Sequence, residues 1–179
     1  LRRGGGVMDR RLEGLEEAFD GLRIEPSRDG RQRLLVDRGS VMSLLSVLVD
    51  RGFDHLHMIS CVDWPEQEEF ELVYIVSAYN LEGSFREEQR DVAMVCCRIG
   101  RKRPVMVSMI GLFDCAEPYE REIHELFGVR FEGHPRLTPL FLDRHYEIPP
   151  FRKDFDTRQY VEGFFGRVPP VEDGDGEKT

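Results

Sequence analysis

The sequence predicts an α+β fold: a single domain with a mixed β-sheet covered by helices, plus an extended C-terminal tail rich in proline and aromatic residues. Helix-type apolar spacing comes first and is followed by a succession of β-type runs, an order typical of helices packed on a sheet. Beyond residue 130, prolines recur at positions 135, 139, 149, 150, 169 and 170 among many aromatic residues. Such chain cannot easily form a core of its own, so it needs a surface to lie on.

The first helix is expected near the N-terminus. Residues 1–8 are glycine-rich and predicted to be a disordered extension, with Met8 as the practical start of the protein. After it, Leu12, Leu15 and Phe19 recur at the spacing of one helical face.

A second helix follows a brief strand expected at residues 33–37. Ser40 suits its N-cap and Gly52 its end. Five apolar residues share one face of this helix: Val41, Leu44, Leu45, Leu48 and Val49.

Four β-type runs then occur in succession, at residues 55–63, 70–80, 91–99 and 105–113. The run at 70–80 carries apolar residues at both odd and even positions. We therefore expect it to be a central strand between two packed layers.

A third helix is predicted to contain Pro118 in its first turn and to end at Gly128. This helix completes the predicted domain, residues 9–129. Residues 130–170 are predicted to be an extended tail that wraps a partner, and residues 171–179 a disordered acidic end.

Charge and cysteine spacing exclude several functions. The net charge of −9 argues against sequence-independent nucleic-acid binding, which requires a basic face. The cysteines, at positions 61, 96, 97 and 115, show no C-x-x-C spacing, and neighbouring strand residues point to opposite faces. We expect buried thiols and neither a metal site nor a cofactor site in this chain. No secretory signal or apolar run of membrane-spanning length is visible, which favours a cytoplasmic location.

Residues 119–135 concentrate charge and histidine in a short window, YEREIHELFGVRFEGHP. His124 and Glu125 begin a zinc-protease H-E-x-x-H motif, but Gly128 stands where the second histidine is needed. A free-standing enzyme using His124 and His134 stays open as an alternative. Glu117, Arg121 and Glu125 lie four residues apart, and ion pairs along such a solvated helix face account for Arg121.

Several motifs in order resemble a known family. The window is followed by LTPLFL at 137–142 and PPFRKDF at 149–155, and preceded by ISCVDW at 59–64 and FELVYIVSAY at 70–79. Together they resemble the C subunit of respiratory complex I (NADH-quinone oxidoreductase) and the related subunits of energy-converting membrane-bound [NiFe] hydrogenases. The resemblance extends from about residue 40 to 156.

The resemblance implies a non-catalytic structural subunit of the hydrophilic arm of an ion-translocating membrane oxidoreductase. Its partners would be the large subunit (the D subunit, or its hydrogenase large-subunit-like counterpart), which forms the quinone or [NiFe] site, and the small, B-type subunit. Iron–sulfur clusters, and in the hydrogenase case a nickel–iron centre, would belong to these partners. The chain would be a peripheral subunit at the cytoplasmic face of the cell membrane.

The motif details favour a membrane-bound hydrogenase-related complex over a quinone-reducing complex I. Members of complex I usually carry an aromatic-Asp pair before L-F-G, where this chain has His124 and Glu125. The segment from Phe151 to Phe155 follows two prolines, so we expect Arg152 and Lys153 to be held out toward a partner. The predicted partner interface consists of Glu120, Arg121, Glu122, Phe131, Glu132, His134, Pro135, Phe151, Arg152, Lys153, Asp154 and Phe155.

Overall fold

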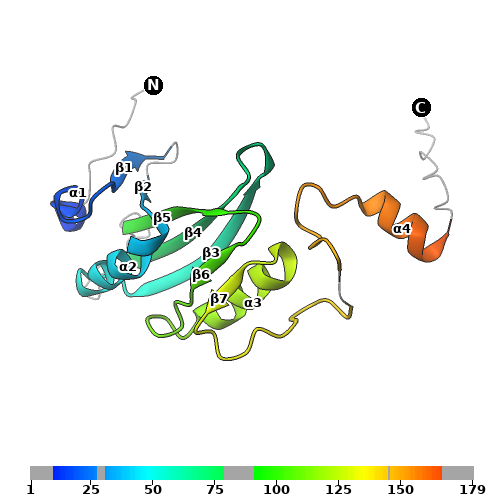
Figure 1. Ribbon diagram of the computed structural model, residues 1–179. Coiled ribbons are helices and arrows are strands. Elements are labelled where there is room, and N and C mark those ends of the chain that lie inside the picture. The colour runs from blue at the N-terminus through cyan, green and yellow to red at the C-terminus, as the bar shows by residue number, and fades with distance from the viewer. Residues whose placement is uncertain (1–9, 28–30, 79–90, 145, 167–179) are drawn as a thin grey trace, which may run out of the picture.

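The centre of the molecule is a five-stranded sheet, seen in a computed structural model that describes residues 10–27, 31–78, 91–144 and 146–166 (Figure 1). Its strands are β1 (Arg23–Pro26), β2 (Gln32–Leu35), β3 (His55–Trp64), β4 (Glu69–Ala78) and β5 (Asp91–Gly100). They lie in the order β1-β2-β5-β4-β3. Strands β2 and β5 pair in parallel and the other neighbours antiparallel, so the sheet is mixed.

Two helices cover one face of this sheet, α2 (Val41–Asp50) and α3 (Ala116–Phe127). Figure 1 shows both in front of the same face, and residues of both belong to the single apolar core. The short α1 (Leu15–Ala18) lies near the N-terminus and α4 (Thr157–Phe165) in the tail. The predicted α+β domain with a helix-covered mixed sheet is confirmed.

Strand β4 lies between β3 and β5, which confirms its central position. Alternate side chains point into the core and are fully buried: Phe70, Leu72, Tyr74 and Val76. On the opposite face, Val73 and Ile75 stay half-buried. The second packed layer expected from the sequence is therefore not formed by the part of the chain that the structure describes.

The N-terminal helix is shorter than its apolar spacing suggests. Gly14 has a positive φ of 74° and divides it into a 3₁₀ turn at Arg10–Leu12 and the short helix α1. Leu12 and Leu15 are buried nonetheless, because the turn keeps both side chains on the core.

The expected strand at 105–113 is wrong beyond its first three residues. Strand β6 (Val105–Val107) pairs in parallel with β7 (Arg130–Glu132) in a separate two-stranded sheet. Past β6, the backbone N–H of Met109 donates to a helix carboxylate instead of to a strand. The chain then turns, with Met109 and Phe113 both buried.

The tail is less extended than predicted. Its first residues form β7, and α4 occupies 157–165, where no proline lies between Pro150 and Pro169. The side chain of Asp156 caps α4 by accepting the Gln159 backbone N–H at 2.9 Å. A helix therefore forms in the tail where a capping residue is present and no proline interrupts the segment.

Candidate docking surface

Helix α3 ends at Gly128, as the sequence predicts. Gly128 adopts a positive φ of 78°, and its N–H donates to the His124 carbonyl at 2.9 Å. A Cβ atom there would also lie 3.0 Å from Arg152 Nη2 and 3.1 Å from Pro149 Cγ. Glycine is therefore required twice, for the left-handed conformation and for the close approach of the tail.

Glu120 is not an interface residue, which corrects the sequence prediction. The side chain is fully buried under α3, where its carboxylate accepts Ser108 Oγ at 2.7 Å and the Met109 N–H at 2.6 Å. Burial raises the pKa of Glu120, although both hydrogen bonds act in the opposite direction. Its role is to attach the turn after β6 to the helix.

Phe131 is likewise wrongly assigned to the interface. It lies on β7 with 2% of its surface exposed and belongs to the apolar core. The domain therefore extends past its predicted end at residue 129, because β7 supplies both a strand and a core side chain.

Two side chains on the opposite face of α3 hold the start of the tail. Arg121 donates to the Thr138 carbonyl at 3.1 Å and to the Pro139 carbonyl at 2.9 Å. Glu125 accepts three consecutive backbone N–H groups, from residues 140, 141 and 142, at 3.0, 2.9 and 2.7 Å. Burial raises the pKa of Glu125, but these hydrogen bonds and Arg121 outweigh it and leave the pKa below its ordinary value.

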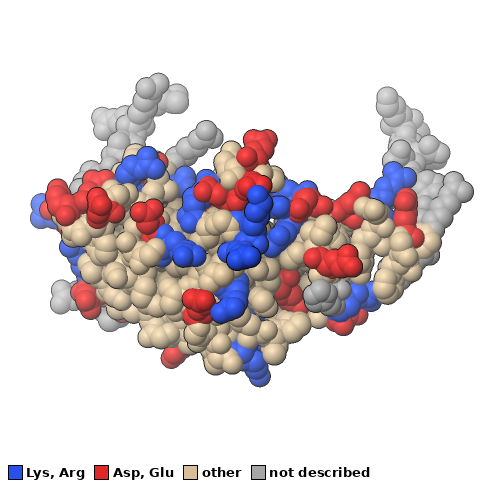
Figure 2. Space-filling model, in the orientation of Figure 1, with Lys and Arg blue, Asp and Glu red and all other residues tan. Residues whose placement is uncertain are grey.

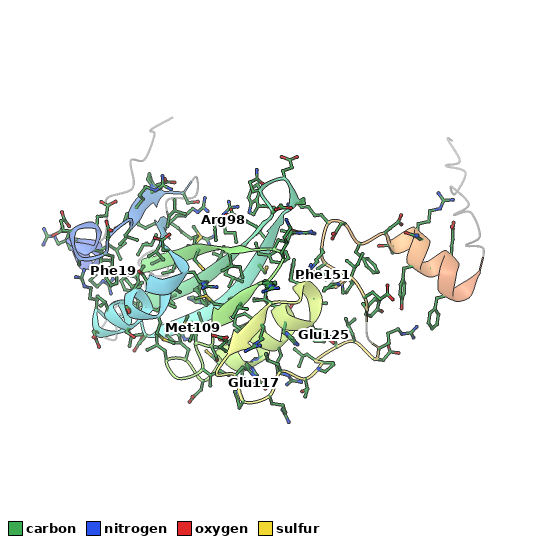
Figure 3. All side chains as sticks on the ribbon, in the orientation of Figure 1. Phe19, Arg98, Met109, Glu117, Glu125 and Phe151 are labelled. Atoms are coloured by element: carbon green, nitrogen blue, oxygen red, sulfur yellow. The ribbon has the colours of Figure 1, made fainter. Side chains whose placement is uncertain are left out.

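The segment 149–155 then returns to the end of α3 (Figure 3). The Phe151 N–H donates to the Leu126 carbonyl at 3.0 Å, and Arg152 Nε donates to the Phe127 carbonyl at 2.7 Å. The Phe151 and Phe127 rings meet edge to face at 5.9 Å. Arg152 thus satisfies the Phe127 carbonyl, which has no partner within α3, and this overturns the expectation that Arg152 points away toward a partner.

A second set of contacts, the Arg101 network, joins the same segment to the sheet. Arg101 bonds the buried Asp63 at 2.8 Å and Asp154 at 2.6 Å, and the Lys153 N–H donates to Asp63 at 2.8 Å. Burial raises the pKa of Asp63, but these donors more than offset it and lower the pKa below its ordinary value. Asp154 is therefore engaged within this chain.

Other predicted interface residues face outward. Phe151 keeps 59% of its surface exposed although its backbone is held. Glu132, Pro135 and the Lys153 side chain are also exposed, with Lys153 Nζ lying 5.8 Å from the Trp64 ring centroid. Three further predicted residues are half-buried: Glu122, His134 and Phe155.

The histidines of the rival enzyme interpretation bind backbone groups. His124 Nδ1 donates to the Val129 carbonyl at 2.8 Å. His134 Nε2 donates to the Glu117 carbonyl at 3.3 Å, while its Nδ1 accepts the Arg136 N–H at 3.0 Å. His124 thus holds the backbone just after α3 and His134 attaches the tail, and the geometry singles out neither as a catalytic base.

The prediction of buried thiols holds for Cys96 and Cys97, whereas Cys61 is half-buried and Cys115 is exposed. Cys96 and Cys97 are each 2% exposed and lie on opposite faces of β5, and burial raises the pKa of Cys97 to about 12. Within the described ranges, no three His, Cys, Asp or Glu side chains are grouped to hold a metal ion. In the same residues, no helix has the length and apolar character to cross a membrane.

The fold combines a sheet covered by helices, the β6–β7 pair and a tail that returns to α3. These features together define the class of protein. The family described as respiratory-chain NADH dehydrogenase, 30 kDa subunit, matches residues 34–161, and the chain belongs to this family. Its members are subunits of membrane-bound oxidoreductase complexes.

Individual relatives agree with this assignment. The chain is 37% identical over 128 residues to the C subunit of F(420)H(2) dehydrogenase of Methanosarcina mazei, covering 70% of this chain and 76% of the relative. It is 31% identical over 157 residues to the C subunit of NADH-quinone oxidoreductase of Moorella thermoacetica, covering 87% and 99%.

Two solved structures share the fold. A chain of the membrane-bound sulfane sulfur reductase, an archaeal respiratory membrane complex, superposes with a TM-score of 0.74 at 26% identity, covering 94% of this chain and 95% of that one. The trypsin-resistant fragment (1–134) of Nqo5 gives a TM-score of 0.60 at 26% identity, covering 71% and 99%.

Proposed function

We propose that this chain is a non-catalytic structural subunit of the hydrophilic arm of a complex-I-like, ion-translocating membrane oxidoreductase. It docks on the large subunit that forms the quinone or [NiFe] site, next to the small, B-type subunit. Redox chemistry and its iron–sulfur or nickel–iron cofactors belong to these partners. The chain lies at the cytoplasmic face of the membrane.

The observation that carries this proposal is an exposed apolar surface on the tail. Phe141 is 68% exposed, Ile148 42%, and Phe151 and Phe164 each 59%. The backbone beside three of these residues is fixed by α3 or by α4, so the side chains are presented in a defined arrangement. Rigid aromatic groups on a held backbone are typical anchors of protein–protein interfaces.

The structure also changes how the tail would dock. Arg152 and Asp154 form bonds within this chain, so they fix the backbone of the surface. Contact with the partner is then made by Phe151, Lys153 and Phe141. The proposed contact surface therefore comprises the exposed side chains of 141–164 together with Glu132 and Pro135.

A membrane-bound hydrogenase-related complex is the type of assembly we favour. The motif details at His124 and Glu125 carry this preference, and the superposition on the sulfane sulfur reductase chain supports a membrane-bound respiratory complex more generally. A quinone-reducing complex I is the second candidate, because the C subunit of the Moorella enzyme is matched over 99% of its length.

Purification through a tagged copy of this chain from native membranes tests both the docking function and the type of complex. We expect a large and a small subunit with iron–sulfur clusters to co-purify, and the complex to evolve hydrogen or reduce sulfur species. Quinone reduction alone would select the second candidate. Recovery of the chain without redox partners would refute the docking function.

The surface itself is tested by Phe141→Ser with Phe151→Ser. Both rings are exposed, so the isolated chain should keep its unfolding free energy within about 1 kcal/mol, while retention of the large subunit falls at least tenfold. Val107→Ser, at a 41% exposed residue of β6, is the matched control and should not affect retention. Full retention by the double variant would exclude this surface.

A further inference from the structure

A pocket of about 750 Å³ lies in the tail, lined by residues 143, 144 and 146–148, by residues 154–156 and by helix α4. In Figure 1 this region lies beside the sheet domain and outside its core. The function proposed above does not say what enters the pocket. Its lining determines the chemistry of an occupant.

Aromatic rings form the apolar walls. The Tyr146 ring lies 5.9 Å from Phe155 and 5.0 Å from Tyr160, and Phe155 lies 5.5 Å from Tyr160. Tyr160 and Phe164, one helical turn apart on α4, stack at 6.1 Å. Because the face of an aromatic ring is electron-rich, such walls attract cations as well as apolar groups.

The polar part of the lining is acidic. It includes Asp143, Glu147, Asp154 and Asp156 against the single base Arg144. Asp143 is paired with Arg144 and Asp154 with Arg101, whereas no cation of the described residues pairs with Glu147 or Asp156. Figure 2 shows acidic side chains bordering the region between the domain and α4.

The same cluster already holds a guanidinium group. Arg144 Cζ lies 4.5 Å from the Phe164 ring centroid, and its nitrogens bond Asp143 at 3.0 and 3.3 Å. Rings and carboxylates in this geometry are therefore compatible with arginine. A planar guanidinium can stack on a ring and bond two carboxylates at once, which a lysine ammonium does less well.

Charge also decides against the C-terminal end of this chain as the occupant. The C-terminal sequence EDGDGEK at 172–178 carries four acids and one lysine, so the acidic lining repels it. A second copy, with a net charge of −9, is disfavoured for the same reason.

We propose that this pocket receives an arginine side chain of the partner protein on which the tail docks. The guanidinium stacks on the Tyr146–Phe155–Tyr160 rings and pairs with Glu147 and Asp156. This inference rests on the proposed docking function and specifies the chemistry of its contact.

Ligand binding to the full-length isolated chain tests the pocket directly. Nα-acetyl-L-arginine amide is titrated while the tyrosine and phenylalanine ring signals are followed by NMR. We expect saturable shifts at Tyr146 and Tyr160. Nα-acetyl-L-citrulline amide has the same shape without the charge, and its affinity should be lower by a factor of about five or more. The corresponding lysine amide is titrated in the same way. Binding of the citrulline or the lysine amide as tight as that of the arginine amide would overturn the assignment to arginine.

Glu147→Gln with Asp156→Asn removes the two charges that pair with no cation of the described residues, and asparagine keeps the helix cap. Affinity for the arginine amide should fall about fivefold or more. Glu162→Gln is the control, because Glu162 pairs with Arg158 on α4 and does not line the pocket. No loss in the double variant would refute the pocket.

The purified complex separates this inference from the docking function. If the wild-type chain retains the large subunit and the double variant retains it equally at every salt concentration, the arginine contact is wrong while docking stands. If the wild-type chain retains no redox partner, docking itself fails. The inference is supported if the variant with Glu147→Gln and Asp156→Asn releases the large subunit at a lower NaCl concentration than the wild-type chain does.

Discussion

Replacement of Arg101 by alanine should strongly destabilise the isolated chain, because Arg101 joins the tail to the sheet. Asp63 is only 3% exposed, and the substitution leaves it with a single charge-stabilising donor, the Lys153 N–H. Removing one partner of a buried ion pair costs about 3–5 kcal/mol. The remaining hydrogen bond places the expected loss near the lower limit, at about 3 kcal/mol.

Asp154→Asn is the matched comparison within the same network. The Asp154 side chain is 50% exposed, so the loss of its ion pair should cost no more than about 1 kcal/mol. Asp63→Asn combined with Arg101→Ala should be more stable than Arg101→Ala alone, because the neutral amide leaves no buried charge without its partner.

Urea unfolding at several pH values measures these effects and adds an independent criterion. The pKa of Asp63 is lowered in the folded protein, so the ionised pair stabilises above the unfolded pKa of about 4 and is lost as pH falls through the folded value. The difference between wild type and Arg101→Ala should therefore be greatest near neutrality and shrink below about pH 4. A loss under 1 kcal/mol, or one that is independent of pH, would refute the buried-charge argument.

Three further expectations concern α3 and the tail. The raised pKa of Glu120 means that the folded state binds its proton more tightly, so stability falls as pH rises from the unfolded pKa near 4.3 to the folded pKa. Glu120→Gln should remove this dependence in urea titrations from about pH 4 upward. Persistence of the same slope would count against the assignment. Glu125→Ala should accelerate amide hydrogen exchange at residues 140–142 by about tenfold, with Glu122→Ala as the unaffected control; unchanged exchange would mean that the carboxylate does not hold this segment. Truncation after Pro149 should leave a folded chain with a lower thermal midpoint, because it loses the backbone contacts of 151–154 with the domain. An unchanged midpoint would mean that this segment does not stabilise the domain and acts only in partner contact.

Elements whose local pattern agrees with their burial were predictable. Helix α2, the three long strands and the stop of α3 at Gly128 follow from apolar periodicity and from the conformational freedom of glycine. Strand β6 could not be delimited in this way, because residues 108–113 carry strand-like apolar residues whose backbone is diverted by Glu120.

The sequence predicted a candidate surface, but it did not predict the contacts that its residues make within the chain. The motifs at 119–135 and 149–155 do lie together, yet Glu120, Phe131, Arg152 and Asp154 bind within the chain. Arg101 was missed entirely, since nothing near it in the sequence indicates a bond to residues 38 positions before it and 53 after it. Glu125 was assigned to a solvated face although it receives the tail.

The sequence by itself determined the family, the α+β class, and the apolar positions of the core, because these depend on periodicity and on ordered motifs within short windows. Only the tertiary structure decided which charges are internal. The direction of a carboxylate or guanidinium depends on which distant segment offers a donor or acceptor once the chain is packed, and a buried charge must find such a partner. Arg152 bonds the last carbonyl of α3 and Asp154 pairs with Arg101. The rings that remain exposed, those of Phe141, Phe151 and Phe164, form the candidate surface.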